Sequence, residues 1–125
     1  MKVAGIGFRA NATLADLRSV LALTGARPDA LASLAAKAAQ PALIELAREL
    51  ALPLIALREE DIAGEQTLTC SPRIKSRFGT GSVAEACALV AARQGAGLAR
   101  SRLITPRLMT ADGMATAALA ERLEP

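Results

Sequence analysis

Short apolar runs alternate along this chain with amphipathic segments that carry helix-capping residues. Residues 3–8, 52–57 and 103–105 have the compact apolar content of buried strands. Pro53 lies at the entry of the second run, where a missing backbone amide is tolerated. Because alternating strands and helices are typical of an α/β sandwich with a mainly parallel sheet, the sequence predicts this fold class.

Helices are expected between these runs. Thr13 precedes Asp16 by three residues and predicts a capping box, and Gly25 is suited to end that helix in the left-handed conformation. Pro41 suits the first position of a second helix. The apolar face predicted for this second helix consists of Leu43, Ile44, Ala47 and Leu50.

Two more helices are predicted in the second half of the chain. Ser71 is expected to cap a short helix that runs through Phe78. A longer helix covers residues 83–93, and Ser82 and Glu85 are predicted to form its capping box.

Residues 30–36 and 114–119 fit either a helix or a buried strand. Alanine content favours a helix in the first segment, but a short apolar run between turns also fits a strand. The acidic stretch 59–65 is expected to be a loop or a single helical turn, and residues 111–113 a turn. The residues alone therefore do not decide between helix and strand for either segment.

The 125 residues suit one domain, and we treat 1–125 as a single unit. The longest uncharged apolar stretch with strand-like content, residues 51–57, is too short to span a bilayer. Near the start of the chain, Arg9 interrupts the apolar stretch that a secretory signal needs. We therefore expect a soluble cytoplasmic protein that does not bind a membrane.

The chain has no histidine, tryptophan or tyrosine, and its two aromatic residues are Phe8 and Phe78. The lack of histidine excludes a Ser-His-Asp or Cys-His catalytic arrangement and a His-ligated metal, and no metal site is expected. The scarcity of aromatic rings argues against base stacking, and thus against nucleic acid as a partner. Cys70 and Cys87 form no CxxC pattern and are expected to be buried or inert.

Positive charge is concentrated between Ser71 and Arg107. This segment has seven basic residues and one acid, Glu85, so it carries +6, whereas the rest of the chain carries −3. The basic residues are Arg73, Lys75, Arg77, Arg93, Arg100, Arg102 and Arg107. A basic half of this kind indicates an anionic partner or, alternatively, a solvated basic face.

Gly79, Thr80, Gly81 and Ser82 immediately precede the helix expected over 83–93. Free amides at a helix N-terminus, together with the helix dipole, favour an anion, and glycines let the backbone approach it closely. The alternative is that the two glycines only permit a tight turn. The pattern is not a Walker loop, since no Gly-Lys-Ser/Thr follows.

Several polar residues are candidates for a site. Arg9 and Lys37 each follow an apolar run, from which a side chain projects at the carboxyl end of a sheet, where open α/β folds bind ligands. A solvated surface cation is the alternative for each. Glu85 is a candidate general base, although a capping box accounts for it without catalysis. Ser71 and Thr80 are interpreted as cap and turn residues, because there is no histidine to activate them.

The order of several motifs resembles one known family. The motifs are Gly5-Ile6-Gly7-Phe8-Arg9, Lys37-Ala38-Ala39-Gln40-Pro41, Ser71, Gly79-Thr80-Gly81-Ser82-Val83-Ala84-Glu85-Ala86, and Pro106-Arg107 before Thr116-Ala117. Over about residues 3–120 the chain is similar to the family of the CobE proteins and the C-terminal domain of CbiG, both of cobalamin biosynthesis. In that family CbiG opens the lactone of a cobalt-containing precursor, and CobE is a small free-standing form on the aerobic route. The chain lacks the other parts of CbiG and therefore resembles CobE.

The resemblance implies that residues 30–35 and 114–120 are strands, which gives a three-layer α/β/α sandwich with a mixed, mainly parallel sheet of about five strands. It also implies a shared cleft. Its candidate residues are Arg9, Lys37, Ser71, Gly79, Gly81, Ser82 and Glu85, to which we add Thr80 and Arg107 as candidate binding residues. Gln40 stands where the family usually has glutamate, which removes a carboxylate base, and Arg107 stands where lysine is common.

We therefore expect a protein that binds a tetrapyrrole intermediate of aerobic cobalamin biosynthesis, without a cofactor of its own. Such intermediates carry many acetate and propionate groups, which suit a basic half and helix-terminal amides. One alternative is a hydrolase acting on a lactone-type intermediate, with Lys37 and Glu85 as candidate proton-transfer groups. A second alternative is an interaction module that docks on other enzymes of the pathway.

Overall fold

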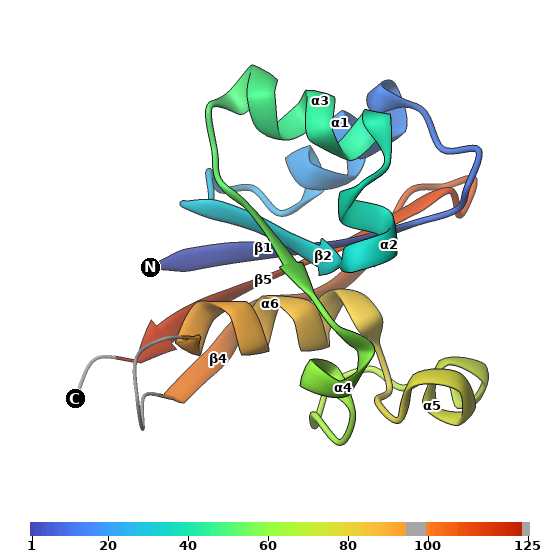
Figure 1. The fold of residues 1–125 in the computed structure, drawn as a ribbon, viewed down its shortest axis with the longest axis vertical. Helices are drawn as coiled ribbons and strands as arrows, with labels where there is room; N and C mark the ends of the chain where they lie inside the picture. The colour runs from blue at the N-terminus through green and yellow to red at the C-terminus, as the bar shows by residue number, and fades with distance from the viewer. Residues whose placement is uncertain (95–99, 124–125) are drawn as a thin grey trace.

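The computed structural model describes residues 1–94 and 100–123, and its middle layer is a five-stranded sheet in the order β3-β2-β1-β5-β4 (Figure 1). The strands are β1 (Lys2–Phe8), β2 (Ala30–Leu34), β3 (Leu54–Leu57), β4 (Arg100–Met109) and β5 (Ala115–Leu123). The β1–β2 and β2–β3 pairs are parallel, whereas β5 is antiparallel to both of its neighbours, β1 and β4. Four strands thus run one way and β5 the other, which confirms the predicted mixed, mainly parallel sheet.

Helices cover both faces of this sheet. They are α1 (Leu14–Leu23), α2 (Ala35–Ala38), α3 (Pro41–Leu50), α4 (Glu59–Ile62), α5 (Pro72–Phe78) and α6 (Val83–Arg93). The helices α1 and α3 lie on one face and α6 lies on the other (Figure 1). The predicted three-layer α/β/α sandwich is confirmed. None of the helices in the two described stretches is long and apolar enough to cross a membrane.

The two faces of the sheet are packed with side chains of different size. The core under α1 and α3 contains large side chains: Ile6, Leu17, Leu31, Leu43, Leu46 and Leu119. The core under α6 is rich in alanine, including Ala86, Ala88, Ala91 and Ala92. Small side chains let α6 lie close to β1. A Cβ atom on Gly5 would be 2.0 Å from the carbonyl oxygen of Ala84 and 2.8 Å from the amide nitrogen of Ala88.

The first predicted helix has the ends that the sequence indicates. The amide of Thr13 donates to Oδ2 of Asp16 at 2.8 Å, and the amide of Asp16 donates to Oγ1 of Thr13 at 3.2 Å. Gly25 follows with φ +73°. In α3 the predicted apolar face is partly wrong, because Ile44 is exposed and Leu46 is buried with Leu43 and Ala47. These three buried residues lie at i, i+3 and i+4, the spacing of one helix face.

The two segments that fit either structure are strands, as the resemblance implied. All five residues of β2 are buried between β1 and β3, and β5 lies between β1 and β4. Strands buried on both faces have no polar alternation, so alanine-rich composition alone does not distinguish them from helices. The strand β4 is longer than the predicted 103–105, and the acidic stretch includes the single helical turn α4.

Candidate functional site

A pocket of about 240 Å³ opens at the edge of the sheet where β1 and β2 end. The pocket is lined by residues from β1, β2, β4, β5 and the helices α2, α5 and α6. The lining residues are 7–9, 33, 34, 37, 74, 78, 82–84, 107 and 113–116. Because β1 and β2 are parallel and β5 is antiparallel to β1, the ends of the first two strands and the start of the third meet at this edge.

Specific bonds hold this edge together. The hydroxyl of Ser33 is buried and donates to the backbone oxygen of Ile6 at 2.7 Å, which ties the end of β2 to β1. In the β4–β5 turn, Asp112 accepts from the hydroxyl of Thr110 at 2.8 Å and from the amide of Met114 at 3.1 Å. These bonds, the Thr110 hydroxyl first, lower the pKa of Asp112. The wall formed by residues 113–116 is therefore fixed by the turn before it.

Three cations from separate parts of the chain line the pocket: Arg9, Lys37 and Arg107. The Nε of Arg9 donates to the backbone oxygen of Gly113 at 3.2 Å, and the Nζ of Lys37 lies 5.0 Å from the centre of the Phe8 ring. Among the residues that the structure describes, no carboxylate forms an ion pair with any of the three. Their positive charge is therefore available to an anion.

The two aromatic residues of the chain both line this pocket. Phe8 lies at the end of β1 and Phe78 at the end of α5. The guanidinium of Arg77 lies 4.5 Å from the centre of the Phe78 ring and also pairs with Glu59, with Nη1 2.8 Å from Oε1. Neither aromatic residue was predicted to lie at the site. Their positions in the sequence, beside Arg9 and beside the Gly79–Ser82 loop, could have indicated it.

The N-terminus of α6 also lies at the pocket. Ser82, the N-cap, and the first two residues of the helix are among the lining residues. The Ser82 hydroxyl accepts from the amide of Glu85 at 3.3 Å. The positive end of the helix dipole therefore adds to the charge of the three cations.

Four of the predicted binding residues line the pocket, namely Arg9, Lys37, Ser82 and Arg107, and four do not. Ser71 caps α5, and its hydroxyl accepts from the amide of Ile74 at 3.4 Å. Gly79, with φ +76°, ends α5, and the buried hydroxyl of Thr80 donates to the backbone oxygen of Glu65 at 2.6 Å. A Cβ on Gly81 would be 2.7 Å from the backbone oxygen of Thr69. These four residues therefore shape the loop beside the pocket.

Glu85 has a role that the sequence did not predict. It is fully buried, and its carboxylate does not return to the Ser82 amide, so only one half of the predicted capping box forms, the bond from the Glu85 amide to the Ser82 hydroxyl. Its Oε1 accepts from the amides of Leu68 at 2.7 Å and Thr69 at 3.1 Å. Its Oε2 accepts from the Thr69 hydroxyl and the Arg107 amide, both at 2.8 Å. Glu85 lies outside the pocket lining, and its four bonds hold the segment before α5 and the backbone of Arg107 in place.

The basic half of the sequence does not gather at the pocket. Three of its seven basic residues pair with carboxylates elsewhere in the chain: Arg77 with Glu59, Arg93 with Glu65, and Arg102 with Glu121. Of the seven, all of which the structure describes, Arg107 alone lines the pocket. The other two cations of the pocket, Arg9 and Lys37, come from outside the basic half.

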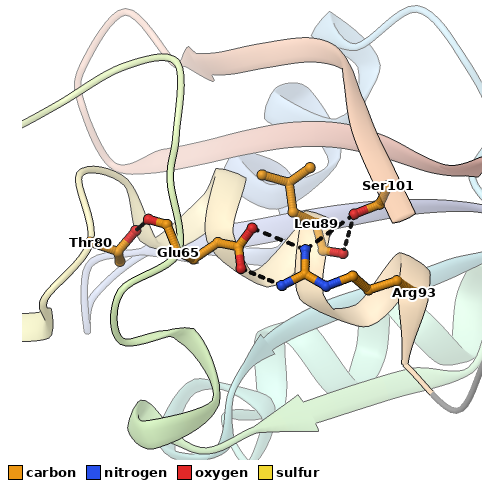
Figure 2. Close-up of polar contacts among 5 residues, drawn as sticks. All are labelled: Glu65, Thr80, Leu89, Arg93 and Ser101. Carbon is orange, nitrogen blue, oxygen red and sulfur yellow. Dashed lines mark hydrogen bonds and ion pairs between the residues drawn. The ribbon is translucent and has the colours of Figure 1, made fainter. Parts of the chain in front are cut away.

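The pair at the C-terminal end of α6 belongs to a larger network (Figure 2). Arg93 binds both carboxylate oxygens of Glu65, with Nη1 3.0 Å from Oε2, and its Nη1 also donates to the hydroxyl of Ser101 at 3.3 Å. That hydroxyl donates to the backbone oxygen of Leu89 at 2.7 Å. The hydrogen bonds to Glu65 raise the pKa of Arg93. The network joins α6, β4 and the loop after α4.

Of the two thiols, Cys87 is buried as predicted, and burial raises its pKa to about 12. Cys70 is exposed, so of the two expected alternatives, a buried or an inert thiol, the first does not apply to that residue and the second stays a prediction. Within residues 1–94 and 100–123, no three His, Cys, Asp or Glu side chains cluster as a metal site.

Comparisons with known proteins identify relatives of this chain in sequence and fold. A family model described as "Cobalamin synthesis G C-terminus" matches residues 2–120. The crystal structure of CobE, a protein from the cobalamin (vitamin B12) biosynthetic pathway, is 32% identical with a TM-score of 0.80, and the match covers 99% of this chain and 91% of that one. The cobalamin biosynthesis protein chiG from Agrobacterium tumefaciens is 35% identical with a TM-score of 0.66, over 97% of this chain and 98% of that one. No curated protein matches the sequence.

Proposed function

The chain belongs to the cobalamin synthesis G C-terminus family and is a cobalamin biosynthesis protein, and on that premise we propose that its pocket binds a polycarboxylate tetrapyrrole intermediate of the pathway. The family predicted from the sequence is thereby confirmed. The assignment to the aerobic route stays a prediction.

One observation carries this proposal: three cationic side chains, none of which forms an ion pair with a carboxylate of the described residues, converge on one largely apolar pocket. Charged donors form the strongest hydrogen bonds with carboxylates, which rim the intermediates of this pathway. The apolar side chains of the pocket, such as Phe8, Leu34 and Met114, suit the hydrocarbon part of the same molecule.

The pocket favours binding over hydrolysis. None of its sixteen lining residues has a carboxylate. The only carboxylate in the basic half, that of Glu85, accepts hydrogen bonds from four donors of the protein. Gln40 is the N-cap of α3 and is not a lining residue. A Lys–carboxylate pair for proton transfer is therefore not assembled around Lys37.

The test is a fluorescence titration with uroporphyrin, whose rings each carry an acetate and a propionate arm. We expect binding at low ionic strength that weakens at physiological ionic strength, because salt screens exposed charges. The charge reversals Arg9→Glu and Lys37→Glu should each weaken binding about tenfold or more. Arg100→Glu is the matched control, because it makes the same change of charge at the start of β4, outside the pocket.

Absence of binding at both ionic strengths would rule out the proposal. Equal loss in Arg9→Glu and Arg100→Glu would mean that net charge, and not the pocket, attracts the porphyrin. Capture of other pathway enzymes in the absence of any tetrapyrrole would then favour the interaction module.

A further inference from the structure

The pocket is small for the class of ligand proposed above. Its volume is about 240 Å³, whereas pockets that enclose drug-sized ligands measure about 300–1,000 Å³. A tetrapyrrole with acidic arms on every ring is larger than such a ligand. The pocket therefore encloses one part of the molecule, and the rest of the macrocycle lies outside it.

The lining indicates which part fits. Phe8 and Phe78 provide aromatic surface, and Lys37 lies directly over the Phe8 ring, with Nζ 5.0 Å from its centre. Positive charge and aromatic surface are thus held next to each other. The complementary chemical unit is a small flat ring that carries anionic arms on adjacent atoms.

The three cations of the pocket come from three separate segments of the chain, so more than one of them can meet an anionic arm. Arg9 is anchored to the backbone oxygen of Gly113 at 3.2 Å, and the backbone of Arg107 is held by Glu85 at 2.8 Å. Lys37 belongs to a third segment, α2. The guanidinium of Arg9 and the backbone of Arg107 are thus held without an anion, which lowers the reorganisation that binding requires.

Resting on the proposed function, we propose that the pocket recognises a single pyrrole ring through its acetate and propionate arms and leaves the other rings of a tetrapyrrole exposed. Binding is then independent of a metal ion at the centre of the macrocycle. The exposed rings stay accessible to an enzyme that acts on them while the protein holds one edge.

The probe is porphobilinogen, a monopyrrole that carries one acetate and one propionate arm. Because the chain has no histidine, tryptophan or tyrosine, every aromatic proton resonance of the protein in D₂O belongs to Phe8 or Phe78. We expect porphobilinogen to shift the resonances of both rings, with a Kd of about 1 mM or tighter. Adipate has the two carboxylates without the ring, and 3,4-diethylpyrrole has the ring without carboxylates. Each should bind at least about tenfold more weakly.

Competition distinguishes this inference from the proposed function. Three results would support the inference. Porphobilinogen should displace uroporphyrin, and porphobilinogen binding should be lost in Lys37→Glu. Zinc uroporphyrin and metal-free uroporphyrin should bind equally within about threefold. Uroporphyrin binding without such displacement would overturn it and leave the proposed function standing. Displacement by adipate as strong as that by porphobilinogen would also overturn it, because the ring would contribute nothing. If uroporphyrin does not bind, both proposals fail.

Discussion

The two ends of α6 differ in whether the cations beside them are paired with carboxylates. At the C-terminal end, Arg93 pairs with Glu65 and lies where the helix dipole is negative, so its charge stabilises the fold. At the N-terminal end, Arg9, Lys37 and Arg107 line a pocket that also receives the positive end of the dipole. Like charges kept together without a carboxylate weaken the folded state, and an anionic ligand offsets this cost. The charge at one end of the helix thus stabilises the fold, and the charge at the other end is the one to which the proposed function assigns binding.

The largest loss of stability should come from a change in the packing that holds both ends of α6 on the sheet. Gly5→Ala would place a Cβ atom 2.0 Å from the carbonyl oxygen of Ala84, so α6 must move away from β1. We expect the free energy of unfolding to fall by about 3 kcal/mol or more in urea denaturation. Gly25→Ala is the control: its Cβ has no atom within 4 Å, and φ +73° alone should cost about 1 kcal/mol. Equal losses would mean that close packing of α6 is not required.

Removal of the Glu85 carboxylate should affect stability and binding together. Glu85→Ala leaves the amides of Leu68, Thr69 and Arg107 without their acceptor, which should cost about 2–3 kcal/mol. Uroporphyrin should also bind more weakly, because the backbone of Arg107 is no longer held. Glu85→Gln keeps one carbonyl acceptor, so its losses should be smaller in both measurements. A variant that loses stability and binds normally would separate Glu85 from the pocket.

The pair at the C-terminal end should contribute to stability only. Side-chain exposure is 33% for Arg93 and 16% for Glu65, so solvent screens this pair in part. We expect Arg93→Ala to cost about 1–2 kcal/mol and to leave uroporphyrin binding unchanged. Arg102→Ala removes the more exposed pair with Glu121 and should cost less than about 1 kcal/mol. Weakened binding in Arg93→Ala would contradict the division between the two ends.

The smallest change in stability is expected when a cation of the pocket is replaced. Lys37→Gln removes one of three like charges and should leave the unliganded protein equally stable, or more stable by up to about 0.5 kcal/mol. The same variant should lose most of its affinity for uroporphyrin. Thermal unfolding with and without uroporphyrin measures both quantities. A clear loss of stability without ligand would show that Lys37 supports the fold through Phe8.

Local patterns in the sequence predicted most of the fold because each depends on near neighbours. The capping box at Thr13, the start of α3 at Pro41 and the cap at Ser71 involve residues within a few positions of one another. The strands β2 and β5 required the family resemblance, because their burial depends on strands that lie far away in the chain.

The site was predicted less completely for the same reason. Arg9 and Lys37 were found because the ends of parallel strands meet at one edge of a sheet. Nothing near Arg93 in the sequence indicates Glu65, which lies 28 positions away. Charge counted along the chain therefore overstated the basic surface. Likewise, the partners of Glu85 lie 16 to 22 positions away, so a local capping box was predicted in their place.

The pairing of β1 with β5 has a consequence for biosynthesis of the protein itself. Seven residue pairs join these strands, from Lys2 with Glu121 to Phe8 with Ala115. The pocket accordingly takes walls from residues 7–9 and from residues 113–116. In a nascent chain on the ribosome the pocket is incomplete until β5 has emerged and inserted between β1 and β4. If the proposed function holds, ligand capture begins only after translation has passed β5, because a chain truncated before β5 lacks one wall of the pocket.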